Sequence, residues 1–444
     1  MKIVITGAGE VGTHLAKMLS NEDQDIILLD SDKQALDNID SNYNLMTWNG
    51  SPSSINTLRD INVGSCDLLI AVTPYTTTNI TTCTMAKALG AKRTVARIDN
   101  FELMLPNNRK LLYDLGVNHL IYPENLAAIE MASSLEHNWA RYWGDLHEGR
   151  LMIIGVKVRS NSKLVDCEIR NLPVKAHNFH IVAIKHGIET IIPTGSDAIR
   201  KDDIVYFITT REYVPEVREL CGKVKRNIDS LIMVGASKVG LRFALQYSDK
   251  FDIKIIDSDR RRCEEVAELL PQCEIVCGDA RNVEVLRENN IYRYDAFMAL
   301  TASSETNILA CLTAKEFDVP KTIADVENIQ FISQAEKLNI GTIINKKLLA
   351  SSRIFKIMLD VDADNAKCLA LADAEVAEIQ VKKGAKITKD PVRKLNLPFG
   401  MTLGAYTRDG KCHLVNGDTQ IEAGDFVVVF CLSGNIHKIE KWFT

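Results

Sequence analysis

Three glycines near the start of the chain have the spacing of a nucleotide-binding loop. Gly7-Ala8-Gly9-Glu10-Val11-Gly12 follows the apolar run Lys2–Thr6 directly. In such a loop the first glycine makes a tight turn, the second leaves room for a pyrophosphate, and the third lets a helix pack on a strand. The phosphates would then bind the free N–H groups at the start of that helix.

An acid follows the glycines at the distance that a dinucleotide site requires. Asp30 ends the next apolar run, and Ser31 after it is a further candidate contact. We expect the Asp30 carboxylate to accept hydrogen bonds from the adenosine ribose, which favours NAD(H) over its phosphorylated form. A lone glycine motif is weak evidence. Between a strand and a helix, and with this acid, it predicts nucleotide binding.

The order of apolar runs predicts which elements position these residues. Runs suited to buried strands lie at 45–48, 67–72, 93–98 and 119–121, and helical patterns lie at 78–89 and 106–115. Such alternation is typical of a doubly wound parallel sheet with helices on both faces. Gly50 with Ser51, and Thr73, follow two of the strands at their carboxyl ends, where open α/β sheets bind ligands.

The chain then repeats itself. After Gly149, short β-rich runs separated by turns predict a small, mixed or antiparallel α+β domain. A second glycine motif, Gly235–Gly240, follows 228 residues after the first, and the same offset relates Gly278 to Gly50. A constant offset indicates a tandem duplication. The second set of candidate nucleotide contacts is Gly235, Ser237, Gly240, Asp257, Asp279 and Thr301.

The predicted fold class is therefore α/β, with two tandem Rossmann-like doubly wound parallel sheets, each followed by a small α+β domain. The predicted segments are a first Rossmann-like domain (1–122), a linker helix (123–148), a first small domain (149–226), a second Rossmann-like domain (227–344), a second linker helix (345–366) and a second small domain (367–444).

Composition excludes several classes of protein. The chain has 444 residues, 46% of them hydrophobic, and its net charge of −5 includes no basic block, so nucleic acid is not expected as a partner. Eleven cysteines without CxxC pairs suit reduced thiols. Cys273 and Cys277 are interpreted as buried small side chains, and no metal is expected. The N-terminus has the pattern of a strand, and no apolar run could span a bilayer, so any membrane role would need a partner chain.

Two tandem copies of this unit resemble the TrkA-type regulatory subunits of bacterial Trk potassium uptake systems. The more specific residues are Asn49-Gly50, Ala71-Val72-Thr73 with Thr78-Asn79, Ala96-Arg97-Ile98, and Tyr122-Pro123-Glu124. The resemblance implies a cytosolic protein that binds NAD(H), with ATP or ADP as further ligands. It also implies a ring of tandem units, held at the inner face of the plasma membrane by a potassium transporter that the protein regulates.

The second copy departs from the residue pattern of this family at two positions, and the first copy departs from it at one stretch. Ser237 replaces the middle glycine, which crowds the pyrophosphate, and Asp325 stands where the first copy has Arg97, which would repel phosphate. We therefore expect the second site to bind NAD(H) more weakly or not at all. The first copy has Tyr75-Thr76-Thr77 where the family often has acids, whereas the second keeps Glu305.

Several assignments keep a plainer alternative. Arg97 is a phosphate or dimer contact, or a surface ion-pair partner. Glu124 lies near the nucleotide or is an ordinary helix-start acid. Thr73 bonds a phosphate or merely ends a strand, and Asn79 is a ligand contact or a helix cap. The stretch Tyr122–Trp143 is expected to form a helix that packs on the other unit, or one that covers its own sheet.

An NAD-dependent dehydrogenase is the rival function, since it would share the cofactor fold. It would need a substrate pocket with a general acid or base. His119 adjoins a predicted strand, and His177 and His180 are expected in a loop of the small domain, so none has a recognisable catalytic setting. A repeated unit without a catalytic domain favours a regulator over an enzyme. Which nucleotide activates it, and the size of the oligomer, are left open.

Overall fold

The computed structural model describes residues 1–20, 24–40, 43, 45–172, 178–187, 189–362, 369–371, 374–432 and 441–443. The chain forms two compact units, each built from parts of both copies. Unit 1 comprises residues 1–132 and 228–358, and unit 2 comprises residues 133–227 and 359–444. Among the described residues, no helix is both long enough and apolar enough to cross a membrane.

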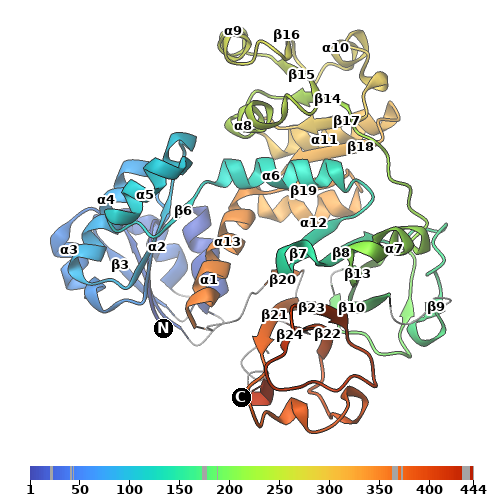
Figure 1. The fold of residues 1–444 in the computed structure, drawn as a ribbon. Coiled ribbons are helices and arrows are strands. Elements are labelled where there is room, and N and C mark those ends of the chain that lie inside the picture. Colours follow the sequence, from blue (N-terminus) through green and yellow to red (C-terminus); the bar gives the residue numbers. More distant parts are fainter. Residues whose placement is uncertain are drawn as a thin grey trace. The chain divides into compact units, whose positions relative to one another are not determined.

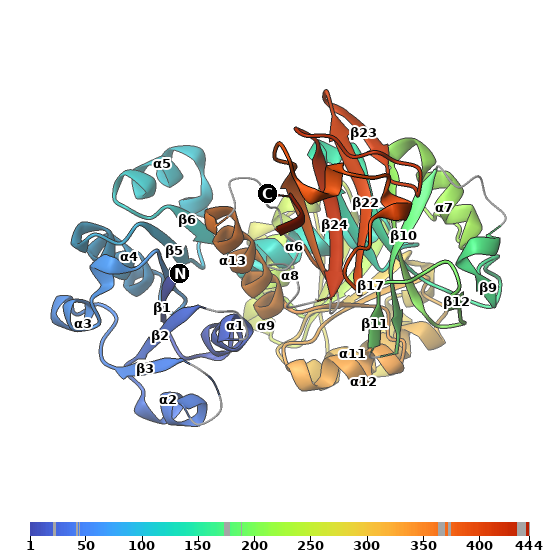
Figure 2. The same cartoon turned by 90° about the horizontal axis from the view of Figure 1, so that it is seen from below.

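The first half of unit 1, drawn in blue to cyan in Figure 1, is a six-stranded parallel sheet in the order β3-β2-β1-β4-β5-β6. The order reverses between β1 and β4, which is where ligands of open α/β sheets bind. In Figure 2, α1 and α2 lie on one side of this sheet and α3 and α4 on the other. The elements are β1 (Lys2–Thr6), α1 (Glu10–Ser20), β2 (Asp25–Asp30), α2 (Lys33–Asp40), β3 (Met46–Asn49), α3 (Ile55–Asp60), β4 (Leu68–Ala71), α4 (Thr76–Leu89), β5 (Arg93–Arg97), α5 (Pro106–Asp114) and β6 (His119–Ile121).

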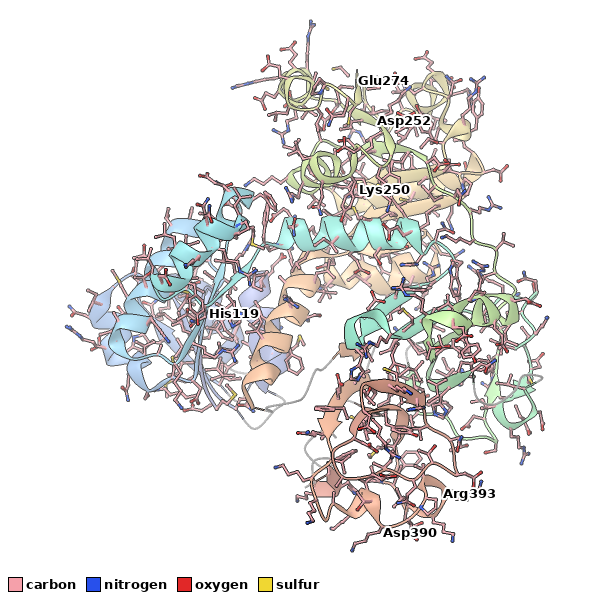
Figure 3. All side chains as sticks on the ribbon, in the orientation of Figure 1. His119, Lys250, Asp252, Glu274, Asp390 and Arg393 are labelled. Carbon is pink, nitrogen blue, oxygen red and sulfur yellow. The ribbon has the colours of Figure 1, made fainter. Side chains whose placement is uncertain are left out.

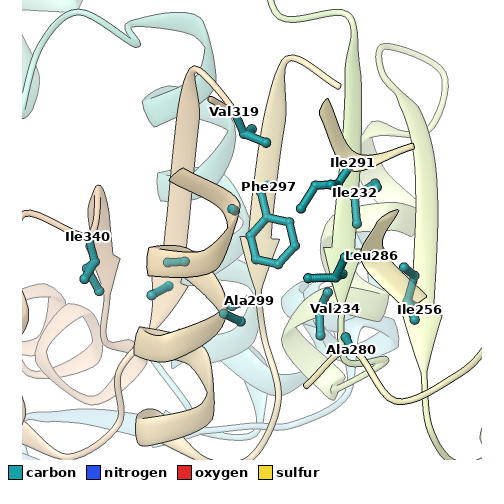
Figure 4. Close-up of a cluster of buried hydrophobic side chains, with 14 of the residues drawn as sticks. Ile232, Val234, Ile256, Ala280, Leu286, Ile291, Phe297, Ala299, Val319 and Ile340 are labelled. Carbon is teal, nitrogen blue, oxygen red and sulfur yellow. The ribbon is translucent and has the colours of Figure 1, made fainter. Parts of the chain in front are cut away.

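The second half of unit 1 repeats this sheet in the order β16-β15-β14-β17-β18-β19. Its central strands β14 and β17 are buried apolar runs, as the middle of a sheet covered on both faces requires. Figure 4 shows Phe297 of β17 in the core of this sheet, with Ile232 and Val234 of the neighbouring β14. The elements are β14 (Ser230–Val234), α8 (Lys238–Tyr247), β15 (Asp252–Asp257), α9 (Arg260–Leu269), β16 (Glu274–Cys277), α10 (Val283–Glu288), β17 (Ala296–Ala299), α11 (Ser304–Glu316), β18 (Lys321–Asp325), α12 (Ile329–Lys337) and β19 (Thr342–Ile344).

Unit 2 contains two antiparallel five-stranded sheets, in the orders β11-β10-β13-β8-β7 and β20-β21-β24-β22-β23. They share an apolar core in which Ile153 and Ile208 of the first sheet cluster with Val428 and Phe430 of the second. The elements are β7 (Tyr142–Leu146), β8 (Leu151–Lys157), β9 (Cys167–Glu168), β10 (Phe179–His186), β11 (Glu189–Ile191), β12 (Ala198–Ile199), β13 (Ile204–Thr210), α7 (Val214–Leu220), β20 (Leu369–Leu371), β21 (Ala374–Gln380), β22 (Met401–Arg408), β23 (Lys411–Leu414) and β24 (Phe426–Leu432).

The predicted α/β class is confirmed, and the small domains are antiparallel. The predicted helix Tyr122–Trp143 is too long: α6 spans Pro123–Glu136, and β7 begins at Tyr142. The alternating residues Tyr142, Gly144 and Leu146 pair with β8 and end the helical region. The matching helix of the second copy is α13 (Lys346–Asp362). The division of the chain into the six predicted segments stays a prediction.

Two further expectations were wrong. Cys273 is half-buried and Cys277 is exposed, because Cys277 ends β16 at the edge of the second sheet. His180 lies in β10 and not in a loop. His177 falls outside the described residues.

Candidate functional site

The structure gives a different reason for the presence of glycine at each of the three positions of the first motif. Gly7 has φ of +106°, donates its N–H to the Leu29 carbonyl at 2.9 Å, and a Cβ there would lie 2.9 Å from the Thr73 nitrogen. A Cβ on Gly12 would lie 1.9 Å from the Gly7 carbonyl oxygen. A Cβ on Gly9, in contrast, would meet no atom within 4 Å. Gly7 and Gly12 are therefore required by the fold, whereas Gly9 faces open space at the start of α1.

Asp30 organises the loop at the end of β2. Its carboxylate accepts hydrogen bonds from the Ala8 N–H at 2.5 Å and the Asp32 N–H at 2.8 Å. The Gly50 N–H donates to the Asp30 carbonyl, and the structure thereby brings together three candidate site residues from separate segments. Ser31 and Ser51 are both exposed. Each carboxylate oxygen retains a lone pair for a ribose hydroxyl.

Asn79 has a role that neither alternative anticipated. Its side-chain oxygen accepts from the Thr73 N–H at 2.9 Å and the Thr73 hydroxyl at 2.7 Å. Its side-chain nitrogen donates to the carbonyls of Thr73 at 2.9 Å and Arg97 at 2.8 Å. This buried amide therefore joins the carboxyl ends of β4 and β5, and the helix cap is Tyr75. Asn307 makes the same four bonds, to Thr301 and Asp325.

A cavity of about 190 Å³ lies beside the first glycine loop. Arg97 of β5 lines it. Lys346 and Lys347, at the start of α13, also line it and were missed, because they come from the second copy. The lining residues are Gly9, Glu10, Val11, Val72, Pro74, Arg97, Pro123, Lys346 and Lys347. Three cationic side chains beside a helix N-terminus suit an anionic ligand.

The second glycine loop has the same backbone but different chemistry. Gly235 has φ of +92°, and Asp257 accepts from the Ala236 N–H at 2.6 Å, as Asp30 does from Ala8. Ser237, however, caps α8, and its hydroxyl accepts from the Gly240 N–H at 3.3 Å. That N–H is therefore already paired with a side chain. Asp279, after β16, is held by Arg281 at 2.7 Å.

Asp325 occupies the position that matches Arg97, and it lies among other buried acids. Asp325 and Glu124 are 4% and 5% exposed, and each has one carboxylate oxygen without a hydrogen-bond partner. Burial, together with the nearby Glu327 carboxylate, raises the pKa of Asp325 to about 7, although the Lys346 ammonium opposes this. Lys346 pairs with Glu327 at 2.9 Å. A site of this charge disfavours phosphate.

This cluster predicts a pH-dependent stability. The folded-state pKa of Asp325 lies above its ordinary value of 3.8, so the native state binds more protons than the unfolded state between these values. Stability should therefore fall as pH rises through this window, and the loss should be complete above the folded pKa. Asp325→Asn removes the ionisation, and we expect it to raise the free energy of unfolding at pH 8 by about 1–3 kcal/mol and by less at pH 5.

Urea denaturation at the two pH values measures this difference. Asp279→Asn is the matched control, because Asp279 is partly exposed and the Arg281 hydrogen bond lowers its pKa. Equal effects of Asp325→Asn at both pH values would contradict the assignment.

Two of the described histidines, His119 and His180, lie in strands. His119 of β6 lies in the first sheet, where burial and then Arg93 lower its pKa to about 4, and its Nε2 is 2.8 Å from the Arg93 side chain (Figure 3). His180 is buried in unit 2, and burial lowers its pKa to about 4. Neither borders the cavity beside the first glycine loop.

Comparisons with known proteins agree with this architecture. A family model described as the TrkA-N domain matches residues 3–123 and 231–346, and one described as the TrkA-C domain matches 153–222 and 376–444. The chain is 30% identical over 450 residues to a Trk system potassium uptake protein TrkA homolog of Archaeoglobus fulgidus, with all of both chains covered. It is 28% identical over 453 residues to the Trk system potassium uptake protein TrkA of Haemophilus influenzae, covering 100% of this chain and 98% of the relative.

Solved structures show a similar fold at low sequence identity. The crystal structure of the GsuK RCK domain matches with a TM-score of 0.63 and 14% identity, covering 100% of this chain and 94% of that one. The GsuK channel bound to NAD matches with a TM-score of 0.62 and 14% identity, covering 100% and 78%.

Proposed function

Because this chain belongs to the TrkA family of potassium uptake proteins, we propose that it is a nucleotide-binding regulatory subunit of a potassium transport system. The observation that carries this proposal is the first glycine loop, where Gly9 faces open space and Arg97 lines the adjoining cavity. We propose NAD(H) as the ligand, with ATP or ADP as further candidates. In this proposal the protein performs no chemical turnover.

The partner in this proposal is a membrane-embedded Trk-type transporter. In this proposal the protein binds it at the inner face of the plasma membrane as a ring of tandem units. The names of the relatives support a partner from a Trk transport system. Nucleotide occupancy shifts the transporter only by the difference in affinity between two arrangements of the protein. A tenfold preference supplies about 1.4 kcal/mol, so several coupled sites would be needed for a near-complete switch.

The proposal predicts one strong NADH site in each chain, and Asp30→Ala tests it. We expect this variant to bind NADH about 1–3 kcal/mol more weakly, because the ribose hydroxyls lose their acceptor. Asp257→Ala is the matched control, since Asp257 makes the same two loop bonds, to the N–H groups of Ala236 and Asp259. It should cost similar stability and leave NADH affinity unchanged. Calorimetric titration measures affinity and stoichiometry together.

The same variants test regulation in vesicles that contain the transporter. Potassium flux should require this protein and should change with NADH, and Asp30→Ala should shift that response to higher NADH concentration. Potassium flux that is the same with and without the protein and the nucleotide would contradict the regulatory function. Steady oxidation of NADH in the presence of a metabolite would also contradict it.

A further inference from the structure

The two copies differ in charge at matched positions around their clefts. Glu10 at the start of α1 corresponds to Lys238 at the start of α8, and Arg97 corresponds to Asp325, both at the offset of 228 residues. After the last strand of each sheet the offset is 223, and there Glu124 corresponds to Lys347. These three charge reversals distinguish the surroundings of the two clefts.

Each linker helix begins at the cleft of the other copy within unit 1. Lys346 and Lys347 of α13 line the cavity beside the first glycine loop. Glu124 of α6 acts on the charge of Asp325, and the next residue, Asn125, accepts a hydrogen bond from Arg242 of α8 at 2.9 Å. The partner-helix alternative for α6 is thus supported. The first cleft therefore receives lysines and the second receives an acid.

Lys347 bridges two acids that belong to different copies. Its ammonium pairs with the Glu10 carboxylate of the first copy and lies 3.2 Å from the Glu327 carboxylate of the second. At the matched place, Lys238 pairs with Asp99 directly at 3.3 Å. Because the first copy has an acid at the helix start, Glu10 and Glu327 would repel each other without Lys347.

The Lys347 ammonium is poised to change partners. Its side chain is 20% exposed, whereas Glu10 is 68% exposed, so Glu10 is well hydrated and loses little when the pair opens. Burial lowers the pKa of Lys347, which means that its charge is incompletely solvated and favours an anion. A phosphate on the N–H groups at the start of α1 would lie beside this ammonium.

We propose that Lys347, supported by Lys346, is a ligand-binding residue of the first cleft and contacts the phosphates of the bound nucleotide from the second copy. On binding, the Lys347 ammonium exchanges the Glu10 carboxylate for phosphate oxygen and keeps Glu327. Residues of both copies then contact the ligand, so binding in the first cleft also acts on the second copy. This inference rests on the proposed function, because it requires that a nucleotide binds there.

Calorimetric titration of NADH, and separately of ADP, into the full chain tests the proposal. Lys347→Ala should weaken binding about tenfold, the size of one charge-assisted hydrogen bond that is partly exposed. Lys347→Glu should weaken it further, and Lys347→Arg should retain most of the affinity. Lys347→Met keeps the aliphatic stem and provides a second neutral variant if Lys347→Ala folds poorly. Lys337→Ala is the matched control, since Lys337 is an exposed lysine of the same half of unit 1 that does not line the cavity.

Glu10→Gln gives a readout that a merely structural lysine would not produce. Releasing Lys347 from Glu10 should tighten NADH binding, and this gain should shrink in the Lys347→Ala background, because the two residues act on one ligand. If Lys347→Ala and Lys347→Met both bind NADH with the affinity of the wild type, this inference is overturned and the proposed function is left intact. Absence of NADH and ADP binding by the wild type would overturn both.

Discussion

Gly12→Val is expected to destabilise the first half of unit 1 by about 3 kcal/mol or more, the upper range for overpacking. Any Cβ at this position would lie 1.9 Å from the Gly7 carbonyl oxygen and 3.1 Å from the Gly7 carbonyl carbon. Both are backbone atoms, so no side chain is able to rotate away. Relief would require α1 to move off β1, and α1 buries Leu15 and Leu19 in this half of unit 1.

Two glycines provide the controls for this prediction. Gly9→Ala adds a methyl group to open space and should leave the unfolding transition unchanged, while it obstructs the place proposed for the pyrophosphate and weakens NADH binding. Gly240→Val should cost less than Gly12→Val, because the matching distance to the Gly235 carbonyl oxygen is 3.0 Å. Thermal unfolding followed by circular dichroism, with NADH titration, measures both effects. A normal unfolding transition for Gly12→Val would contradict the packing argument.

The sequence was informative where a local pattern coincides with the fold. The buried strands of unit 1 are continuous apolar runs, and the predicted runs at 93–98 and 119–121 correspond to β5 and β6. The Gly7 turn requires φ above zero, which marks it in the sequence as well as in the structure. The constant offset between copies was equally visible, because corresponding loops have the same length up to β18.

Properties that depend on distant neighbours were not predicted. Asparagine is a residue type that is common in helix caps and in ligand contacts, and only the fold shows that the Asn79 side-chain amide joins β4 to β5. The helix at 122–143 was extended too far because Trp143 and its neighbours continue an apolar pattern, whereas pairing of β7 with β8 determines where it ends.

The lysines of the first cleft are the main omission. Lys347 lies far along the chain from Gly9, and the change of offset after β18 conceals its correspondence to Glu124. Aligning the two copies by their strands would have exposed that charge reversal, because Ile121 and Ile344 both end the last strand of a sheet.

Arg97→Asp is expected to reduce NADH affinity at the first cleft by about a hundredfold. The variant gives the first copy the residue that the second has at Asp325. Two unit charges 4 Å apart near a protein surface interact by about 4 kcal/mol, so replacing attraction by repulsion would exceed a loss of about 2.8 kcal/mol, even with partial screening by water. Arg97 borders the same cavity as Gly9, and this places the reversed charge where the phosphates are proposed to bind.

The fold should tolerate Arg97→Asp, which makes a binding measurement decisive. Asn79 holds the Arg97 carbonyl and not its guanidinium, so the join between β4 and β5 survives the substitution. Arg109→Asp is the control, because it makes the same charge change at an exposed position of α5 that does not line the cavity. If only the net charge mattered, both variants would weaken NADH binding equally. If Arg97 contacts the ligand, Arg97→Asp alone loses affinity, and the loss should diminish as salt screens the repulsion. Unchanged affinity in Arg97→Asp would remove Arg97 from the site and place the phosphates elsewhere on the glycine loop.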